Sequence, residues 1–387
     1  MDTPAEIAPR SRLPGSGTTI FTVMSALAAE HGAVNLGQGF PDYPVDPRLV
    51  ELFAKALRDG HNQYPPMAGL PALREAIAAK VERLYGRAYD PGEEVTVTAG
   101  ATQAISTAIQ ALTQPGDEVI VFEPAYDSYL PAIRLAGAVP VPVPLAVPGY
   151  HIDWPAVRKA VTPRTRLIVV NSPNNPGTSV LSADDLRQFE SLTRGTPIVI
   201  VSDEVYEHLV FDGLRHESLA RSAELAARSV VIASFGKTFH ATGWKVGYAV
   251  APKALMAEFR RVHQFIVFTV STPAQHALAA FLANPSHYEG LADFFAPRRK
   301  LLREALAATP LELLPGEGTY FQLVRYGRVS DEPDEAFCRR LTTQVGVAAI
   351  PLSAFYRDGT DHRVIRFCFA KREETLLAAA ERLRKLG

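Results

Sequence analysis

Between residues 94 and 250, short apolar runs alternate with segments of helical periodicity, and this alternation constrains the fold most strongly. The runs are rich in β-branched residues and span 94–98, 118–122, 139–143, 167–170, 198–201, 229–233 and 246–250. Helices are predicted between several of them, at 102–113, 127–136, 153–161 and 183–192. Strands that are apolar along nearly their whole length and alternate with helices are typical of a mainly parallel sheet covered on both faces. We therefore predict an α/β fold around a seven-stranded, mainly parallel sheet.

The segments on either side of this alternation have a different pattern. We predict an irregular arm up to residue 46, then a helix that Asp46-Pro47 begins and a second helix from Leu70 to about Tyr85. Beyond residue 252 the pattern is helical and then mixed, with short strands predicted at 320–325, 347–350 and 364–369. We therefore predict three parts, which are an N-terminal arm with part of a small domain (1–46), a large domain (47–285) and a small α+β domain (286–387).

Composition excludes several classes of protein. The chain has 387 residues and a net charge of −1, so it is long enough for a large and a small domain and lacks the charge of a nucleic-acid-binding protein. Its apolar stretches are too short to span a bilayer, and its first residues do not form a signal peptide. Two cysteines argue against a disulfide framework or a cysteine-rich metal site. We predict a cytoplasmic protein with no membrane, nucleic-acid or metal partner.

Polar and aromatic side chains follow the predicted strands where ligands of open α/β sheets bind, beyond the carboxyl ends. They lie at 99–103, 123–126, 171–177, 202–206 and 234–237. Taken singly, each group has more than one interpretation. Gly100-Ala101-Thr102 suits an anion at a helix N-terminus or an ordinary turn, and Asp203-Glu204 suits a magnesium ion or a turn cap. Nucleotide-binding glycine motifs do not follow the first strand.

Lys237 connects these groups into one hypothesis. It lies four residues beyond a buried strand, where a charged and unpaired amine is costly. The charge disappears if the amine forms an imine with pyridoxal 5′-phosphate. This cofactor also needs a carboxylate for its ring nitrogen, donors for its ring oxygen, an aromatic neighbour and a phosphate site, and the strand ends supply all four.

The same residues carry a resemblance to a known family. The matching motifs are Asn35-Leu-Gly-Gln-Gly-Phe-Pro-Asp42, Asn62-Gln-Tyr64, Asn174-Asn-Pro176, Ser202-Asp-Glu-Val-Tyr206, Ser234-Phe-Gly-Lys-Thr238, Gly243-Trp-Lys-Val-Gly247, Gly318-Thr-Tyr-Phe321 and the segment 365–369. Through them the chain resembles the class I aminotransferases of fold type I, and within that class the methionine and kynurenine aminotransferase group. The resemblance covers almost the whole chain. One departure is the order Pro176-Gly177-Thr178, where relatives have Pro-Thr-Gly.

The resemblance implies roles at the cofactor. Lys237 would form the internal imine and move the proton at the substrate α-carbon, and Asp203 would pair with the pyridine nitrogen. Asn175 and Tyr206 would hydrogen-bond the ring oxygen. The remaining implied cofactor residues are Tyr126, stacked on the ring, and the phosphate-binding group Gly100, Ala101, Thr102, Ser234 and Lys245, joined by Tyr64 from a second subunit of a homodimer.

The resemblance also implies how the substrate binds. Arg366 would clamp the α-carboxylate, helped by Asn175 and the backbone of Gly39. Aromatic residues near the site, among them Phe40, Tyr43, Phe355 and the pair Phe265 and Phe268, favour an apolar substrate side chain or else pack the domain junction.

We therefore predict transfer of an amino group from a methionine-like, aromatic or kynurenine-like L-amino acid to a 2-oxo acid in two half-reactions. The alternatives left open by the residues are β-elimination from cysteine conjugates, other reactions of the same cofactor, and a ligand-sensing regulator without catalysis.

Overall fold

A seven-stranded sheet forms the centre of the protein, as predicted. The computed structural model describes residues 10–15 and 17–386. The strand order is β2 (Val95–Thr98), β8 (Gly247–Val250), β7 (Ser229–Ser234), β6 (Val199–Asp203), β5 (Thr165–Asn171), β3 (Glu118–Glu123) and β4 (Val139–Pro144). All neighbours pair in parallel except β8, which runs antiparallel to both β2 and β7.

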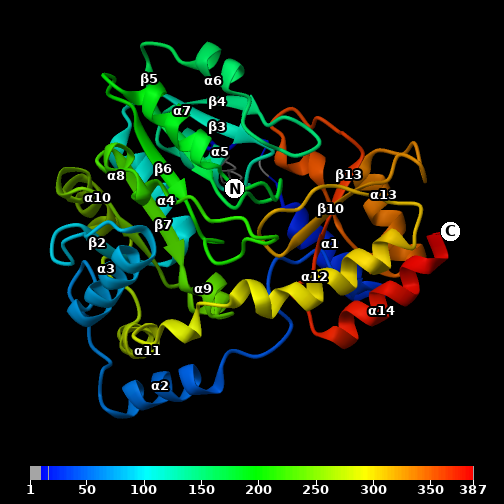
Figure 1. Ribbon diagram of the computed structural model, residues 1–387, viewed down its shortest axis with the longest axis horizontal. Helices are drawn as coiled ribbons and strands as arrows, with labels where there is room; N and C mark the ends of the chain where they lie inside the picture. The colour runs from blue at the N-terminus through cyan, green and yellow to red at the C-terminus, as the bar shows by residue number, and fades with distance from the viewer. Residues whose placement is uncertain (1–9, 16, 387) are drawn as a thin grey trace, which may run out of the picture.

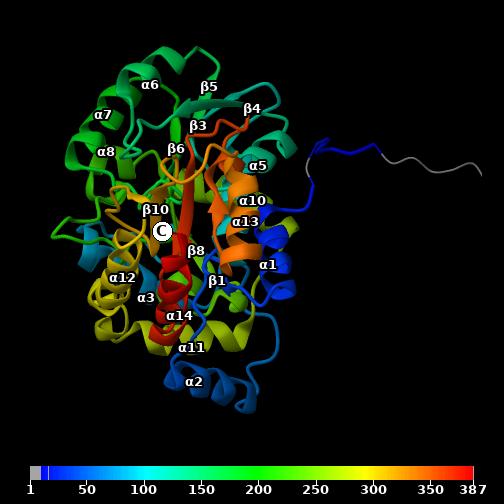
Figure 2. The same cartoon turned by 90° about the vertical axis from the view of Figure 1, so that its right-hand side faces the viewer.

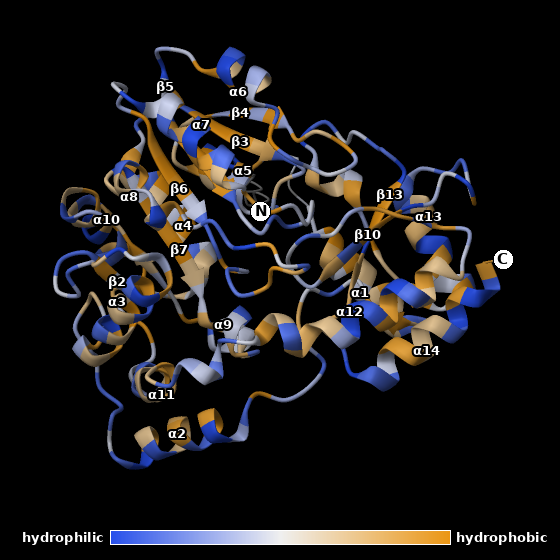
Figure 3. Cartoon of the chain, in the orientation of Figure 1, coloured by the Kyte–Doolittle hydropathy of each residue, from blue (hydrophilic) through white to orange (hydrophobic). Residues whose placement is uncertain are grey.

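Helices cover both faces of this sheet (Figure 1). On one face lie α4 (Gly100–Leu112), α5 (Tyr129–Leu135) and α10 (Lys253–Ile266). The other face is covered by α3 (Pro71–Tyr85), α6 (Trp154–Ala160), α7 (Ala183–Thr193), α8 (Ala223–Ala226) and α11 (Thr272–Leu282). Alternate residues of β5 enter the two cores, Leu167 and Val169 on the first side and Ile168 and Val170 on the second. This two-sided burial explains the continuous apolar runs, which Figure 3 shows as orange strands.

A second, smaller assembly lies beside the central sheet (Figures 1 and 2). Its antiparallel sheet has the order β12 (Ile350–Pro351), β13 (Val364–Cys368), β10 (Phe321–Arg325) and β9 (Glu312–Leu313). Its helices are α12 (Leu291–Ala307), α13 (Asp334–Arg340) and α14 (Glu373–Leu383). Near the N-terminus, β1 (Val34–Asn35) pairs in parallel with β11 (Val347–Ala348). The domain boundaries after residues 46 and 285 stay a prediction.

The prediction of an irregular arm is wrong for residues 20–30, which form helix α1 (Ile20–Glu30). The Thr19 side chain caps it by accepting a hydrogen bond from the Thr22 backbone, and Met24 and Ala28 are buried. Apolar residues one and two turns apart were the signal for this helix. Residues 1–9 of the predicted arm lie outside the described residues. By contrast, α2 (Pro47–Arg58) begins as predicted, with Asp46 as its cap.

Within residues 10–15 and 17–386, no helix combines the length and the apolar character needed to cross a membrane.

Candidate active site

One cavity lies at the carboxyl edge of the central sheet and collects the predicted cofactor residues. It contains about 680 Å³ of space between protein atoms, part of it open to solvent, which is within the range of small-molecule sites. The predicted residues that line it are Gly100, Ala101, Thr102, Tyr126, Asn175, Asp203, Tyr206, Ser234, Lys237 and Lys245. β2, β3, β5, β6 and β7 end at this edge and the antiparallel β8 begins there, so the sequence motifs meet in space as predicted.

Tyr64 is the exception among the predicted cofactor residues. Its side chain is 83% exposed, and its ring packs edge-on against Phe268, with 5.5 Å between the centroids. It lies in a separate surface groove with Asn62 and Thr272. Within its own chain, Tyr64 therefore does not contribute to the cavity.

Lys237 lies in α9 (Phe235–Thr238), the short helix that directly follows β7. Its amino group donates to the backbone oxygen of Gly39 and to the hydroxyl of Tyr320, both at 3.2 Å. Burial lowers the pKa of Lys237 to about 8, because the charged form loses its hydration. A larger fraction of this amine than of an exposed lysine is therefore in the neutral, nucleophilic form near pH 8. The motif containing Tyr320 was recognised in the sequence, but this contact was not predicted.

Asp203 ends β6 and is 4% exposed. The Tyr129 hydroxyl donates to its Oδ2 at 2.5 Å, and the Val205 backbone donates to its Oδ1 at 3.3 Å. Burial raises the pKa of Asp203 to about 6, although the Tyr129 hydrogen bond opposes this rise. A carboxylate held in this way is suited to a cationic partner within the cavity. Sequence reasoning missed Tyr129, which lies three residues beyond Tyr126 and begins α5.

The part of the cavity lined by the start of α4 is suited to an anion. Gly100, Ala101 and Thr102 form the first turn of α4, where backbone N–H groups and the helix dipole favour negative charge. Glycine is required beside it, because a Cβ at position 247 would lie 2.7 Å from the Ala233 oxygen and 3.1 Å from the Ala101 nitrogen. The Lys245 amine lies 3.4 Å from where a Cβ at Gly100 would be. An ammonium group and a helix N-terminus therefore converge here.

Arg366 enters the site from the small sheet, in the middle of β13, and is 1% exposed. Its guanidinium donates to the Asn175 side-chain oxygen and, at 3.2 Å, to the Gly37 oxygen. The guanidinium carbon lies 3.9 Å from the centre of the Phe321 ring. Burial lowers the pKa of Arg366, while Tyr206 opposes this change. Arg366 and Asn175 thus lie together as predicted, and Gly37 was not predicted.

Two further predicted substrate residues are near Lys237 and Arg366. The Gly39 oxygen accepts hydrogen bonds from Lys237 and, at 2.6 Å, from the Tyr320 hydroxyl. A Cβ at Gly39 would lie 3.0 Å from the Phe321 ring. Phe40 is 44% exposed, and its backbone oxygen accepts from Lys371 at 2.8 Å.

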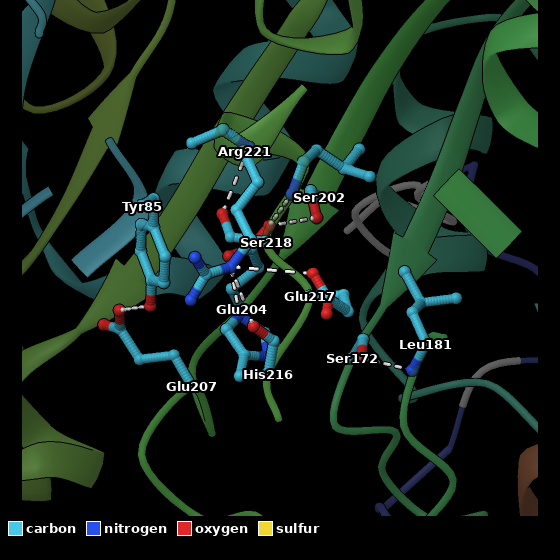
Figure 4. Close-up of polar contacts among 12 residues, drawn as sticks. Tyr85, Ser172, Leu181, Ser202, Glu204, Glu207, His216, Glu217, Ser218 and Arg221 are labelled. Atoms are coloured by element: carbon cyan, nitrogen blue, oxygen red, sulfur yellow. Dashed lines mark hydrogen bonds and ion pairs between the residues drawn. The ribbon is translucent and has the colours of Figure 1, made fainter. Parts of the chain in front are cut away.

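Glu204 does not line the cavity, and its side chain contacts Ser202 and His216 instead (Figure 4). Its carboxylate accepts hydrogen bonds from Ser202 at 2.8 Å and from the Leu219 backbone at 3.1 Å, and it lies 2.9 Å from the His216 ring nitrogen. In the part of the chain that the structure describes, no group of three or more histidine, cysteine or acidic residues could hold a metal ion. Glu204 is thus occupied by protein partners, including the start of the short 3-10 helix at Leu219–Arg221.

The cavity fits pyridoxal 5′-phosphate on the chemistry of its donors. Its lining combines an anion site at the start of α4, the buried carboxylate of Asp203 and the amine of Lys237, whose pKa is lowered. These are the phosphate, ring-nitrogen and aldehyde partners that the cofactor requires.

Comparison with known proteins gives a consistent result. Residues 31–383 match the model of the family Aminotransferase class I and II. The chain is 51% identical over 381 residues to the methionine aminotransferase of Escherichia coli (strain K12), covering 98% of this chain and 99% of the relative. It is 36% identical over 411 residues to human kynurenine–oxoglutarate transaminase 1, covering 97% of each. A crystal structure of the Escherichia coli protein YbdL, described as having a methionine aminotransferase function, superposes with a TM-score of 0.96 and 51% identity, over 98% of this chain and all of that one.

Proposed function

The chain belongs to the class I and II aminotransferases, as its motifs predicted, and from this premise we propose that it uses pyridoxal 5′-phosphate to transfer the amino group of a neutral L-amino acid to a 2-oxo acid. The proposed donors are methionine, aromatic amino acids and kynurenine-like compounds. The observation that carries the proposal is that one cavity is lined by the anion site, the buried carboxylate of Asp203 and Lys237 with its lowered pKa, and that Arg366 is hydrogen-bonded to Asn175 of the same lining.

Each residue of the cavity has a defined task in this proposal. Lys237 holds the cofactor at rest and then moves the proton at the substrate α-carbon. Asp203 keeps a proton on the ring nitrogen, and Tyr129 fixes the orientation of its carboxylate. Gly100, Ala101, Thr102, Ser234 and Lys245 would hold the phosphate, and Tyr126 would be the aromatic neighbour of the ring. When bound, the cofactor supplies an electron-accepting ring that lowers the barrier to breaking a bond at the α-carbon.

Asn175 links the cofactor to the substrate side. Its side-chain oxygen accepts from Arg366, so its amide nitrogen is the group that donates to the ring oxygen beside Tyr206. Arg366 has a planar fork of donors, which suits a bidentate bond to the substrate α-carboxylate. The resting bond of Lys237 to the Gly39 oxygen holds its amine near the loop that also carries Phe40.

Aromatic rings around Arg366 support an apolar substrate. Its guanidinium carbon lies 5.3 Å from the Phe21 ring centre and 5.4 Å from the Phe355 ring centre, in addition to the contact with Phe321. Burying a methylene group of the substrate against such rings contributes about 0.8 kcal/mol, whereas a second carboxylate would lose its hydration. Tyr43 packs instead on His240 and Phe294, with ring centroids 5.1 and 5.7 Å away. Its contacts agree with the alternative interpretation, in which such aromatic residues pack the domain junction.

Rapid-mixing measurement of the first half-reaction tests the substrate proposal. Methionine, phenylalanine, tyrosine, kynurenine and aspartate are each mixed with the holoenzyme, and the loss of the cofactor absorbance band gives kcat/KM. We expect the apolar donors to exceed aspartate. An aspartate value above those of methionine, phenylalanine and tyrosine would overturn the argument. Formation of pyruvate and ammonia from a cysteine conjugate without a 2-oxo acid would instead support β-elimination.

We also propose a homodimer in which Tyr64 completes the phosphate site of the second copy. Tyr64 is 83% exposed and Phe265 84%, and both are large rings that a partner would cover. Mixing Lys237→Ala chains with Tyr64→Ala chains tests this, because a mixed dimer then contains one intact site. Recovery of activity is expected, and a fully active monomer in light scattering would contradict the proposal.

A cytoplasmic location is also proposed, since Cys338 and Cys368 are both free and buried.

A further inference from the structure

The segment from Ser202 to Glu207 presents functional groups on two sides. Asp203 and Tyr206 line the cavity, whereas Glu204 and Glu207 do not line it and instead make the polar contacts drawn in Figure 4. Glu204 and Glu207 are 1% and 6% exposed, so each side of the segment is fixed by buried contacts. Glu207 is peptide-bonded to Tyr206, and its contacts therefore set the position of the turn that carries the Tyr206 ring.

Glu207 accepts hydrogen bonds from the side chains of Lys80, Tyr85 and Tyr248. We call these four residues the Glu207 cluster. The Lys80 amine donates to Oε1 at 2.5 Å, and the Tyr248 hydroxyl donates to the same oxygen at 3.3 Å. The Tyr85 hydroxyl donates to Oε2. Lys80 also donates to the Tyr248 hydroxyl at 2.9 Å. The Glu207 carboxylate is therefore held from both of its oxygens.

The partners come from two elements that adjoin the site. Lys80 and Tyr85 lie in α3, while Tyr248 lies in β8, three residues after Lys245. Glu207 thus connects the turn that carries the ring-oxygen donor Tyr206 with the strand that follows the phosphate-side lysine. In front of this turn, the Tyr206 ring packs edge-on against Tyr320, with centroids 5.1 Å apart.

The cluster is charged although it is buried. The Lys80 and Glu207 side chains are each 2% exposed. Burial alone would raise the pKa of Glu207, but the Lys80 ammonium lowers it to about 2, so the carboxylate is ionised at neutral pH. A buried ion pair of this kind contributes little stability compared with apolar residues of the same size. Apolar residues could not reproduce its geometry, because three directed hydrogen bonds fix the position of the Glu207 carboxylate.

We propose that the Glu207 cluster is a positioning device that holds Tyr206 in place to donate to the cofactor ring oxygen, an inference that rests on the proposed function. Glu207 and Lys80 touch neither substrate nor cofactor and act through the neighbouring turn. A hydrogen bond from Tyr206 to the ring oxygen favours the unprotonated form of the bound cofactor, so the pH midpoint of its visible absorbance band reports the position of Tyr206.

The decisive variant is Lys80→Met combined with Glu207→Gln, which removes both charges and retains the volume. Because neither charge is left unpaired, this protein is expected to fold with a melting temperature near that of the wild type. We expect its absorbance midpoint to move to higher pH by about 0.5–1 unit, the value of a weakened hydrogen bond to a charged group. Apoenzyme titrated with pyridoxal 5′-phosphate should also bind it more weakly.

A double-mutant cycle with Tyr206→Phe separates positioning from general stability. Tyr206→Phe alone should raise the midpoint, and adding the Lys80 and Glu207 changes should then move it no further. The matched control is Glu118→Gln with Arg164→Met. This variant removes an ion pair in which Arg164 Nε donates to Glu118 Oε1 at 2.9 Å, and Glu118 is the first residue of β3, at the end of the strand away from the cavity. The control should leave the midpoint unchanged.

Three outcomes would overturn the proposal. They are a wild-type midpoint in the Lys80→Met, Glu207→Gln protein, a further shift on top of Tyr206→Phe, and an equal shift in the control. If the double variant does not fold, Tyr248→Phe removes one donor and retains the packing, and it must move the midpoint in the same direction. A wild-type apoenzyme that gains no visible band with pyridoxal 5′-phosphate would refute the proposed function itself, which is a separate result.

Discussion

The central sheet presents its side chains to the site from the ends of its strands, whereas the small sheet presents Arg366 from the middle of one strand. Asp203 ends β6, Lys237 follows β7, and the anion site follows β2. Arg366 instead lies between Ile365 and Phe367 within β13, and it reaches the site because the two sheets lie beside one another. The ends of parallel strands are the usual place for ligands, and the middle of an antiparallel strand is not.

The residues from the two sheets therefore have different roles in the reaction. The residues from the central sheet hold the cofactor and move protons, so changes there should lower kcat. Arg366 holds the part of the substrate that does not react, so changes there should act mainly on KM.

The largest effect is expected at Lys237. Lys237→Ala removes the group that holds the cofactor and transfers the proton, and we expect kcat to fall by about 10⁴-fold. Steady-state transamination of methionine measures this loss. Borohydride reduction of the wild-type holoenzyme, followed by peptide mapping, provides the check on the assignment, because the label should be on Lys237. A label on Lys245 would reverse the roles of the two lysines.

Asp203→Asn should produce the next largest loss. Asparagine retains the shape of the side chain but cannot hold a positive charge on the ring nitrogen. We expect the half-reaction rate to fall by about 10³-fold with little change in KM, as for the removal of a preorganised electrostatic contact. Stopped-flow absorbance with methionine measures the rate. Tyr129→Phe is the matched control, since it removes only the hydrogen bond to Oδ2 and should cost much less.

The contrast between the two sheets also explains what could be predicted from the sequence. The strand ends were predictable because buried parallel strands leave continuous apolar runs, and whatever follows such a run lies at one edge. Lys237 and Asp203 were found in this way. Arg366 came from the family resemblance, because it lies inside a strand that is buried along its whole length and the sequence of this strand does not show where the guanidinium is directed.

Contacts made by docking of distant segments could not be predicted. The Tyr320 hydroxyl accepts a hydrogen bond from Lys237 across more than eighty residues of sequence, and periodicity does not encode such a contact. Helix α1 was missed for a different reason. Its first turn contains Ile20 and Val23, which favour strands by propensity, and the Thr19 cap and the buried Met24 override that preference.

Arg366→Lys tests the substrate side. Lysine retains the charge but loses the planar fork, and therefore the simultaneous bonds to Asn175 and to the α-carboxylate. Losing a charged hydrogen bond of about 1.5–3 kcal/mol corresponds to a decrease in kcat/KM of about 10- to 100-fold. We expect most of it as a higher KM in a methionine titration. A loss confined to kcat would show that the small sheet takes part in the chemistry as well.

The smallest effect is expected at a contact between a loop of the central sheet and a loop of the small sheet. There, His151 Nε2 lies 3.2 Å from Glu317 Oε1. His151 follows β4, and Glu317 precedes β10 and also accepts from the Val180 backbone. The hydrogen bond to Glu317 raises the pKa of His151 above its ordinary value of 6.5. His151 therefore binds its proton more tightly in the folded chain than in the unfolded chain. Its contribution to stability is complete below about pH 6.5 and is lost as the pH rises through the folded pKa.

His151→Gln should accordingly lower the melting temperature near pH 6 and leave it unchanged near pH 9. The side chain is 51% exposed, so solvent screening limits the difference to at most about 1 kcal/mol. Thermal unfolding of the apoenzyme at the two pH values measures it, with His31→Gln at the exposed end of α1 as the control. Transamination rates should not change, because the pair contacts neither the lysine side nor the arginine side of the site. An equal loss of stability at both pH values would show that His151 acts by packing rather than by charge.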